Sequence, residues 1–253
     1  MKAILSIALV TLREVLRRKV QVNLLLFGSL VIVASLMISK LTIGEQHRIL
    51  SDLGLSAATA IGTLIAVFVG SSLVAGDIER RVLLPVIAKP ISRTQYLVGR
   101  YLGLAASLIL NLAAMAVVLA AMLAIEAGST RPLDVSLLGA IAMLGVQLLV
   151  VAAVAILFSA VTSTTLAAIF TLAIAIAGHL SGEIRAIWQG DATWIATAVW
   201  YLVPNLGALS LNASVVYRTA MPPGTWLAAG YGTLYAATAL ALASFAFEKR
   251  DLR

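Results

Sequence analysis

The feature that most constrains this chain is a run of 48 residues, 135–182, without a single Lys, Arg, Asp or Glu. One helix of that length would be roughly 72 Å long, whereas the hydrocarbon core of a bilayer is about 30 Å thick. The run must therefore cross a membrane twice. Its polar residues Ser159 and 162–165 predict the turn, which places one span at about 135–158 and the next at about 166–181.

The remainder of the chain is similarly poor in charge. Of 253 residues, 61% are hydrophobic and 11% are charged, whereas soluble domains carry about 25% charged residues. The chain has too few polar side chains to coat a soluble surface, so we expect an all-α integral membrane protein with a single transmembrane domain. Four further spans are predicted at 20–39, 53–75, 95–125 and 225–247, with loops at 40–52 and 126–134.

The first 19 residues predict an amphipathic helix that lies in the membrane interface. Apolar side chains recur at helical spacing, and basic residues occupy another side of the helix. Such a helix directs its basic face toward anionic headgroups. Glu14 and Arg18 stand four residues apart, which favours an ion pair on one face. The apolar stripe consists of Leu5, Ala8, Leu9, Leu12, Val15 and Leu16.

The distribution of basic residues decides between six and seven spans, because cytoplasmic segments are enriched in Lys and Arg. With six spans, the inner segments hold five of these residues before the first span, five at 76–100 and three in the tail, which is 13 of 18. A seventh span at 192–217 lowers the inner share to 11 of 18. We therefore expect six spans in the cytoplasmic (inner) membrane with both termini in the cytoplasm. Residues 183–224, which Pro204 interrupts, then form an outer re-entrant or interfacial hairpin.

A charged segment between the second and third spans, residues 76–92, is the most informative part of the sequence. Its charged side chains cannot enter lipid at low cost. Apolar residues at 78, 82 and 86 favour a short amphipathic helix, and Ser92 to Gln95 fit a capping box at the start of the next helix. A solvated loop that only fixes topology is the open alternative. The segment contains Asp77, Glu79, Arg80, Arg81, Lys89 and Pro90.

Here the sequence resembles a known family. Residues 77–103 read DIERRVLLPVIAKPISRTQYLVGRYLG and are similar to the first cytoplasmic loop of type-2 ATP-binding-cassette (ABC-2) exporter permeases. The closing residues 247–252 are similar to the end of that family, and residues 201–205 resemble the subgroup of nitrous-oxide-reductase maturation and gliding-motility permeases. Arg80 and Arg81 depart from the common Glu-x-Gly-Thr pattern. The matching residues are Glu79, Leu84, Lys89, Pro90, Ile91, Ser92, Arg93, Gly99, Arg100 (commonly Lys) and Gly103.

The resemblance implies a division of labour between chains. In the family, two permease chains pair, as a homodimer or with a related permease, and each contacts a separate ATPase subunit. ATP and Mg²⁺ are then expected on the ATPase, because this chain has no GxxxxGK[ST] phosphate loop; we expect no cofactor, metal site or catalytic residue in it and no nucleic-acid partner. The expected ATPase contacts are Asp77, Glu79, Arg80, Arg81, Lys89, Pro90 and Arg93, supported by Arg13, Glu14, Arg17 and Arg18.

Two other functions stay open. A secondary transporter places ionisable groups near the membrane midplane, often on broken helices, and the predicted spans offer no Asp, Glu, Lys or Arg there. This composition disfavours ion-coupled transport. The other function is an ATP-driven mechanotransmitter that acts on a periplasmic protein, and it would use the same permease machinery. The sequence does not separate that function from export.

Isolated polar residues inside the spans are interpreted as structural contacts. His179 is expected to face the bundle or the interface rather than to bind a metal or carry a proton. Asn111 and Gln147 are expected to hydrogen-bond between helices rather than to touch substrate. Aromatic residues of the outer region fit an interface belt, and they are Trp188, Trp194, Trp200, Tyr201 and Trp226.

Overall fold

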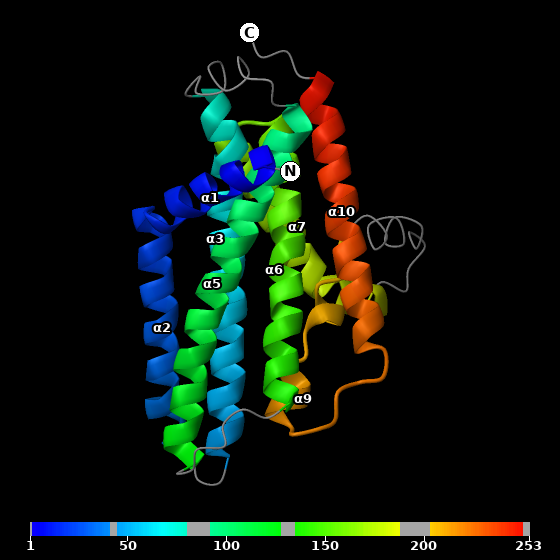
Figure 1. Cartoon of the computed structure of the whole chain (residues 1–253). Coiled ribbons are helices and arrows are strands. Elements are labelled where there is room, and N and C mark those ends of the chain that lie inside the picture. The colour runs from blue at the N-terminus through cyan, green and yellow to red at the C-terminus, as the bar shows by residue number, and fades with distance from the viewer. Residues whose placement is uncertain (1, 41–44, 80–91, 128–134, 188–202, 250–253) are drawn as a thin grey trace.

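Six long helices form a bundle in the computed structural model of this chain, which describes residues 2–40, 45–79, 92–127, 135–187 and 203–249. All six are apolar and long enough to cross a membrane, which confirms the predicted count and the all-α fold class. They are α2 (Lys19–Ser39), α3 (Gln46–Glu79), α5 (Arg93–Ala127), α6 (Val135–Val161), α7 (Thr164–Ile187) and α10 (Thr225–Lys249). The start of the chain and the end of α10 lie at the same end of the bundle, which we call the N/C end (Figure 1).

The N-terminal helix α1 (Lys2–Leu16) is slightly shorter than predicted, and α2 begins after a brief turn. Figure 1 shows α1 lying across the N/C end while α2 runs away from it along the bundle. Within the predicted apolar stripe, Val15 is fully buried, whereas Leu5 and Leu9 are 63% and 48% exposed. The helix therefore packs on protein with one side and leaves an apolar side on the surface, as an interfacial helix does.

Helix α3 extends beyond the span that hydropathy predicts. Residues 46–52 were expected in a polar loop, but they are helical, and Leu50 among them is fully buried. At its other end the helix passes Gly76 and reaches Glu79, so the first four residues of the predicted charged segment continue α3. The remainder of that segment, 80–91, lies outside the described residues, and its short helix stays a prediction.

The uncharged run divides into two helices as predicted. Helix α6 ends at Val161 and α7 begins at Thr164, so the turn lies where the polar residues indicate it. The predicted end of the fifth span is too early, because α7 continues to Ile187. Residues 183–187 therefore belong to a helix and not to the outer hairpin. Hydropathy marks only the apolar part of a helix. Glu and Arg end the apolar run, but both are good helix formers, so the helix continues through them.

The described part of the predicted outer hairpin, residues 203–224, folds back against the bundle with the short helices η1 (Gly207–Leu209) and α9 (Asn212–Val216). It lies along the halves of α6, α7 and α10 that are far from the N/C end (Figure 1). Leu206 is fully buried, and its amide donates to the carbonyl of Gly178 in α7 at 3.0 Å. This irregular backbone is thus packed on protein, as a segment at membrane depth requires.

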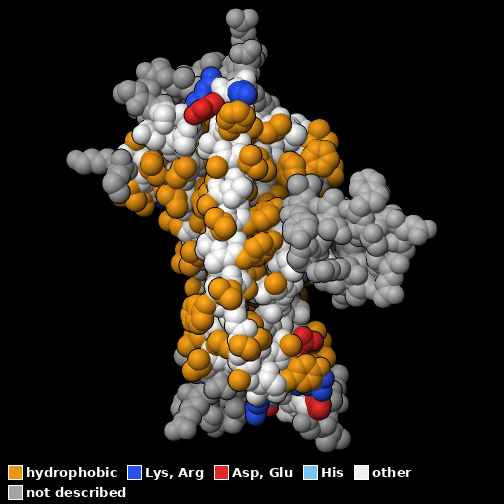
Figure 2. Space-filling view, turned by 90° about the vertical axis from the view of Figure 1, so that its right-hand side faces the viewer, with side chains coloured by type: hydrophobic (Ala, Val, Ile, Leu, Met, Phe, Trp, Pro, Cys, Tyr) orange, Lys and Arg blue, Asp and Glu red, His pale blue; other side chains and the backbone are white. Residues whose placement is uncertain are grey.

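The core lies between α3 and α6, the two most buried spans. A Cβ atom on Gly70 of α3 would lie only 2.7 Å from Cβ of Ala155 in α6, so the two backbones approach closely there. Helices α2, α7 and α10 expose many apolar side chains instead. Figure 2 shows hydrophobic side chains over the middle of the α10 face and charged side chains toward both ends. This pattern fits a bundle whose middle is surrounded by lipid.

Candidate functional site

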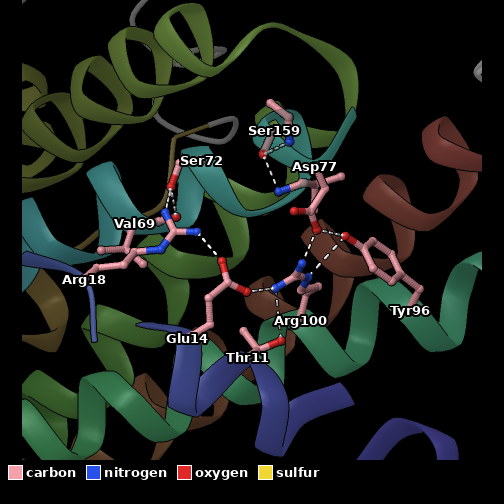
Figure 3. Close-up of polar contacts among 11 residues, drawn as sticks. Thr11, Glu14, Arg18, Val69, Ser72, Asp77, Tyr96, Arg100 and Ser159 are labelled. Carbon is pink, nitrogen blue, oxygen red and sulfur yellow. Dashed lines mark hydrogen bonds and ion pairs between the residues drawn. The ribbon is translucent and has the colours of Figure 1, made fainter. Parts of the chain in front are cut away.

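Three of the four ion pairs between described residues lie in one site around Arg100 of α5, at the N/C end. Its side chain is only 10% exposed and contacts two carboxylates from two other helices. Nη1 donates to Oε2 of Glu14 in α1 at 2.6 Å, and Nη2 donates to Oδ2 of Asp77 in α3. Figure 3 shows the guanidinium lying between these two acids. One buried cation therefore joins three helices.

Neutral side chains use the remaining donors of the guanidinium. Nε donates to the hydroxyl of Tyr96 at 3.1 Å, and that hydroxyl donates to Oδ2 of Asp77. Nη1 also lies 3.4 Å from Oγ1 of Thr11, a fully buried residue of α1. A buried arginine is tolerated when its charge is paired and its N–H groups have partners, and both conditions hold here.

A second cation, Arg18, completes the site from the turn after α1. Its Nη2 donates to Oε1 of Glu14 at 2.6 Å, which confirms the predicted pairing of residues four apart. Its Nη1 donates to Oγ of Ser72 in α3 at 2.5 Å. The two cations balance the two carboxylates. Burial raises the pKa of Glu14, but the hydrogen bonds and charges of Arg18 and Arg100 outweigh burial, so its pKa lies below the ordinary value. We call Thr11, Glu14, Arg18, Ser72, Asp77, Tyr96 and Arg100 the Arg100 cluster.

Glycines of α5 bring α1 close enough to form this cluster. A Cβ atom on Gly99 would lie 2.7 Å from Cβ of Ile7. On Gly103 it would lie 2.5 Å from Cβ of Thr11 and 2.6 Å from the carbonyl oxygen of Ala8. The Gly-x-x-x-Gly spacing thus serves close helix packing. Because α1 rests directly on α5, Glu14 of α1 reaches the side chain of Arg100, which lies between the two glycines.

The charged residues next to 80–91 bind other helix ends. Glu79, the last residue of α3, accepts a hydrogen bond from the amide of Thr164 at 2.9 Å and so caps the N-terminus of α7.

On the other side of 80–91, Ser92 and Gln95 exchange hydrogen bonds at the start of α5. The amide of Gln95 donates to Oγ of Ser92 at 3.2 Å, and the amide of Ser92 donates to Oε1 of Gln95 at 3.4 Å. The predicted capping box at the start of α5 is confirmed.

Arg93, the first residue of α5, binds the end of α10. Its Nη1 donates to the carbonyl oxygens of Phe247 and Glu248, both at 3.0 Å. The hydroxyl of Thr94 donates to Oε1 of Glu248 at 3.0 Å, and the ring of Tyr96 stacks on Phe247 with centroids 6.1 Å apart. A cation at the last carbonyls of a helix is favoured by the helix dipole.

The residues of the predicted coupling segment and of the predicted interfacial helix take part in several different contacts. Glu14, Arg18 and Asp77 meet in the Arg100 cluster, while Glu79 and Arg93 bind α7 and α10. Arg13 of α1 and Arg17, in the turn after α1, are exposed and take no part in the cluster. Their docking on an ATPase stays a prediction. The predicted contacts Arg80, Arg81, Lys89 and Pro90 lie outside the described residues.

Sequence reasoning missed the central residue. Arg100 was matched to a family motif, but it was not assigned a partner. The available signal was its position inside a predicted apolar span, because an ionisable group there needs a partner in the protein. Its partners Glu14 and Asp77 stand 86 and 23 residues away, and no spacing rule links them. Thr11, Tyr96 and Ser72 carry no sequence signal of their own.

Polar residues deeper in the bundle behave largely as predicted. Gln147 of α6 and His179 of α7 are hydrogen-bonded, with Nε2 of each 2.6 Å apart. Nδ1 of His179 lies 2.8 Å from the carbonyl of Ala175, which assigns the ring proton to Nδ1 and makes Gln147 the donor. This contact confirms the interhelical bond expected for Gln147. Asn111 is different, since its buried Nδ2 finds no hydrogen-bond partner among the described residues.

Comparison with known proteins gives one match that spans almost the whole chain. A family model described as ABC-2 family transporter protein matches residues 7–252. No match was found among curated proteins. The matched region includes the Arg100 cluster, both flanks of 80–91 and all six spans.

Proposed function

The chain belongs to the ABC-2 family of transporter proteins, and from that premise we propose that it is the permease subunit of an exporter driven by a separate ATPase subunit. ATP and Mg²⁺ bind to the ATPase in this proposal, because this sequence has no phosphate loop. Two permease chains pair in the inner membrane, with their termini in the cytoplasm. The resemblance of residues 201–205 supports the subgroup of nitrous-oxide-reductase maturation and gliding-motility permeases.

The observation that carries the proposal is the set of contacts on both sides of residues 80–91. Just before this segment, Asp77 binds Arg100 and Glu79 caps α7. Just after it, Arg93 binds the end of α10. A force on the segment therefore reaches α1, α5, α7 and α10 through short polar contacts. Such an arrangement is what a permease needs if an ATPase at the N/C end is to move its helices.

These contacts divide the predicted docking residues by role. The residues proposed to contact the ATPase directly are Arg80, Arg81, Lys89 and Pro90, with the exposed Arg13 of α1 and the exposed Arg17 of the turn after it. Those proposed to position helices instead are Glu14, Arg18, Asp77, Glu79 and Arg93. The division matters for experiments, because a change in the second group alters the fold of the N/C end as well as any docking.

Co-purification tests the partner. The tagged full-length chain, purified from its native host in mild detergent, should bring down a second chain with a phosphate loop. Repeated purifications that yield no such chain would overturn the proposal.

Charge reversal tests the docking surface. The double variant Arg80→Glu/Arg81→Glu should insert normally but lose ATPase co-purification or separate ATP hydrolysis from transport. Glu79 is left intact because it caps α7. Lys40→Glu, a reversal of an exposed cation at the other end of α2, is the matched control and should keep both properties. Unchanged co-purification and coupling in the double variant would reduce residues 80–91 to a loop that only fixes topology.

One observation favours the mechanotransmitter as a second candidate. The end of the bundle opposite the N/C end has a hollow of about 540 Å³ lined by charged and aromatic side chains, including Arg48, Glu126 and Tyr217. A protein outside the membrane could dock there. Since the chain has no cysteine, Tyr217→Cys provides a unique attachment point for a crosslinker in whole cells. A specific periplasmic adduct would favour the mechanotransmitter, and substrate-stimulated transport in proteoliposomes without one would favour export.

A further inference from the structure

A serine of α6 takes part in the backbone hydrogen bonding of α3. Ser159 is fully buried, and its hydroxyl donates to the carbonyl of Ser71 at 2.6 Å. The same oxygen accepts the amides of Ala75 at 2.8 Å and Val74 at 3.2 Å. Figure 3 shows Ser159 beside the turn of α3 that carries Asp77. A side chain placed in the hydrogen-bond ladder of another helix is a recognised cause of local bending.

The stretch of α3 around this contact, Gly70–Gly76, is rich in small residues, which are two glycines, two serines and an alanine beside Leu73 and Val74. Ser71 and Ser72 donate to the carbonyls of Phe68 and Val69 in their own helix, a pattern that bends helices. At Gly70 the close approach of Ala155 excludes any larger side chain. Gly76 differs, because a Cβ atom there would meet no atom of another part of the described chain within 4 Å. Packing among the described residues does not require glycine at 76, so its effect there is on backbone flexibility.

We propose that α3 bends at Gly70–Gly76 and that Ser159 is the positioning residue that holds this stretch in one conformation. The body of the helix stays packed on α6, while the last turn, which carries Asp77 and Glu79, moves relative to it. An ATPase bound at residues 80–91 would drive this movement, and that part of the proposal rests on the proposed function. The bend itself does not rest on the proposed function.

The contacts within and beyond the bend explain what such a movement would do. Within the stretch, Arg18 binds Ser72. Beyond it, Asp77 binds Arg100 of α5 and Glu79 binds the start of α7. Because α1 packs directly on α5, bending would shift α5 together with α1, and the start of α7, relative to the body of α3 on α6. A rigid α3 would carry all four helices together and move none of them against another.

A simpler interpretation is that Ser159 only packs α6 against α3. The two interpretations differ in what they expect of Gly76. Under simple packing, Gly76→Ala alters no contact of Ser159 and slows exchange only by the ordinary gain of alanine over glycine in a helix, as Gly230→Ala does around residue 230. Under the bend, the same substitution also stiffens the last turn, so exchange at 72–79 slows by more than that ordinary gain.

Hydrogen–deuterium exchange of the purified full-length permease in detergent tests the bend without any ATPase. Peptides that cover 72–79 should exchange roughly fivefold faster in Ser159→Ala, the change expected for one lost hydrogen bond. In Gly76→Ala they should slow by more than the roughly fivefold that alanine gains over glycine in an ordinary helix, which peptides around residue 230 measure in Gly230→Ala. Two variants serve as matched controls. Thr162→Ala removes a hydroxyl from the end of the same helix that bonds only to the backbone at 158 and 163, and Gly230→Ala is an equally unobstructed glycine in α10. Both should leave exchange at 72–79 unchanged.

The outcomes separate the interpretations. Opposite shifts in the two variants support the bend when the slowing in Gly76→Ala exceeds that around residue 230 in Gly230→Ala and the global melting of Gly76→Ala is unchanged or rises by no more than a few degrees. Slowing at 72–79 in Gly76→Ala that is no larger than the slowing around residue 230 in Gly230→Ala overturns it, even if Ser159→Ala unfolds. If Ser159→Ala is folded and its exchange at 72–79 is unchanged, Ser159 does not hold the stretch in place, and the proposal is overturned. None of these results depends on whether an ATPase co-purifies, so the bend and the proposed function fail independently.

Discussion

The two ends of the bundle are held together by different kinds of contact. At the N/C end, two cations and two carboxylates meet in the Arg100 cluster, and Arg100 and Asp77 among them are largely away from water. Toward the other end, residues 203–216 are held by neutral contacts such as the Leu206 amide on the Gly178 carbonyl and the Asn205 amide on the Tyr231 hydroxyl. The charged contacts there, from Arg48 to Glu45 and Tyr217, are exposed to solvent. A charged cluster fails when one partner is lost, whereas backbone contacts and packing tolerate the loss of a single side chain. The N/C end is therefore sensitive to the loss of a single side chain, and the opposite end tolerates such a loss.

The largest effect that this comparison predicts is for Arg100→Leu. The substitution strands the buried carboxylate of Asp77, and breaking a buried pair by removing one partner costs about 3–5 kcal/mol. We expect that loss in the unfolding free energy measured by denaturant titration in detergent. Arg13→Gln, which removes an exposed arginine of α1, should change stability by less than about 0.5 kcal/mol.

A double variant identifies the cause of that loss. Asp77→Asn in the Arg100→Leu background removes the stranded charge, so part of the stability should return. Additive losses in the double variant would mean that the two residues act independently, and the ionic account of the N/C end would be wrong.

Next in size is the effect of Gly103→Ala. The new methyl group would lie 2.6 Å from a backbone carbonyl oxygen of α1, so α1 must shift, and overpacking of this kind costs about 1–3 kcal/mol. Gly230→Ala in α10 meets no atom of another described segment within 4 Å and should be neutral or stabilising by up to about 1 kcal/mol. Equal melting temperatures for the two variants would show that α1 is not anchored by this contact.

Much of this fold follows from the sequence because lipid imposes simple rules. Charge-free runs gave six spans, a polar group between two of them gave the turn at 162–163, and the capping box at Ser92 gave the start of α5. Each of these signals is local. The i,i+4 pair of Glu14 and Arg18 belongs to the same class, since helix geometry alone brings its members together.

What sequence reasoning missed is nonlocal or lies outside lipid. The helix ends at 46–52 and 183–187 were missed because hydropathy identifies the apolar residues that cross lipid and not the residues at which a helix begins or ends. The partners of Arg100 depend on how α1 crosses α5, a packing angle that no residue pattern states. Ser159 was assigned only to a turn, because a serine that bonds to another helix looks like any other serine.

A smaller effect is expected when the pH is lowered past the titration of Glu14. Its pKa is depressed in the folded protein, so its contribution is present above the ordinary value of 4.5 and is lost as the pH falls from there through the lower folded pKa. Glu14→Gln should cost roughly 1 kcal/mol at pH 7, a screened value because the side chain is 37% exposed. Melting curves of both proteins from pH 7 to acid should converge at the low end. A difference that persists at the lowest pH would assign the role of Glu14 to packing.

The smallest effect tests the tolerant end. Gln147→Leu removes the donor to His179, and interhelical hydrogen bonds of this kind average about 0.6 kcal/mol in membrane proteins. His179 also lines a groove of about 520 Å³ together with Ser56 and Thr59. We therefore expect a loss near that average in the same denaturant titration. A loss as large as that of Arg100→Leu would mean that this half of the bundle also depends on single polar contacts, and the contrast between the two ends would not hold.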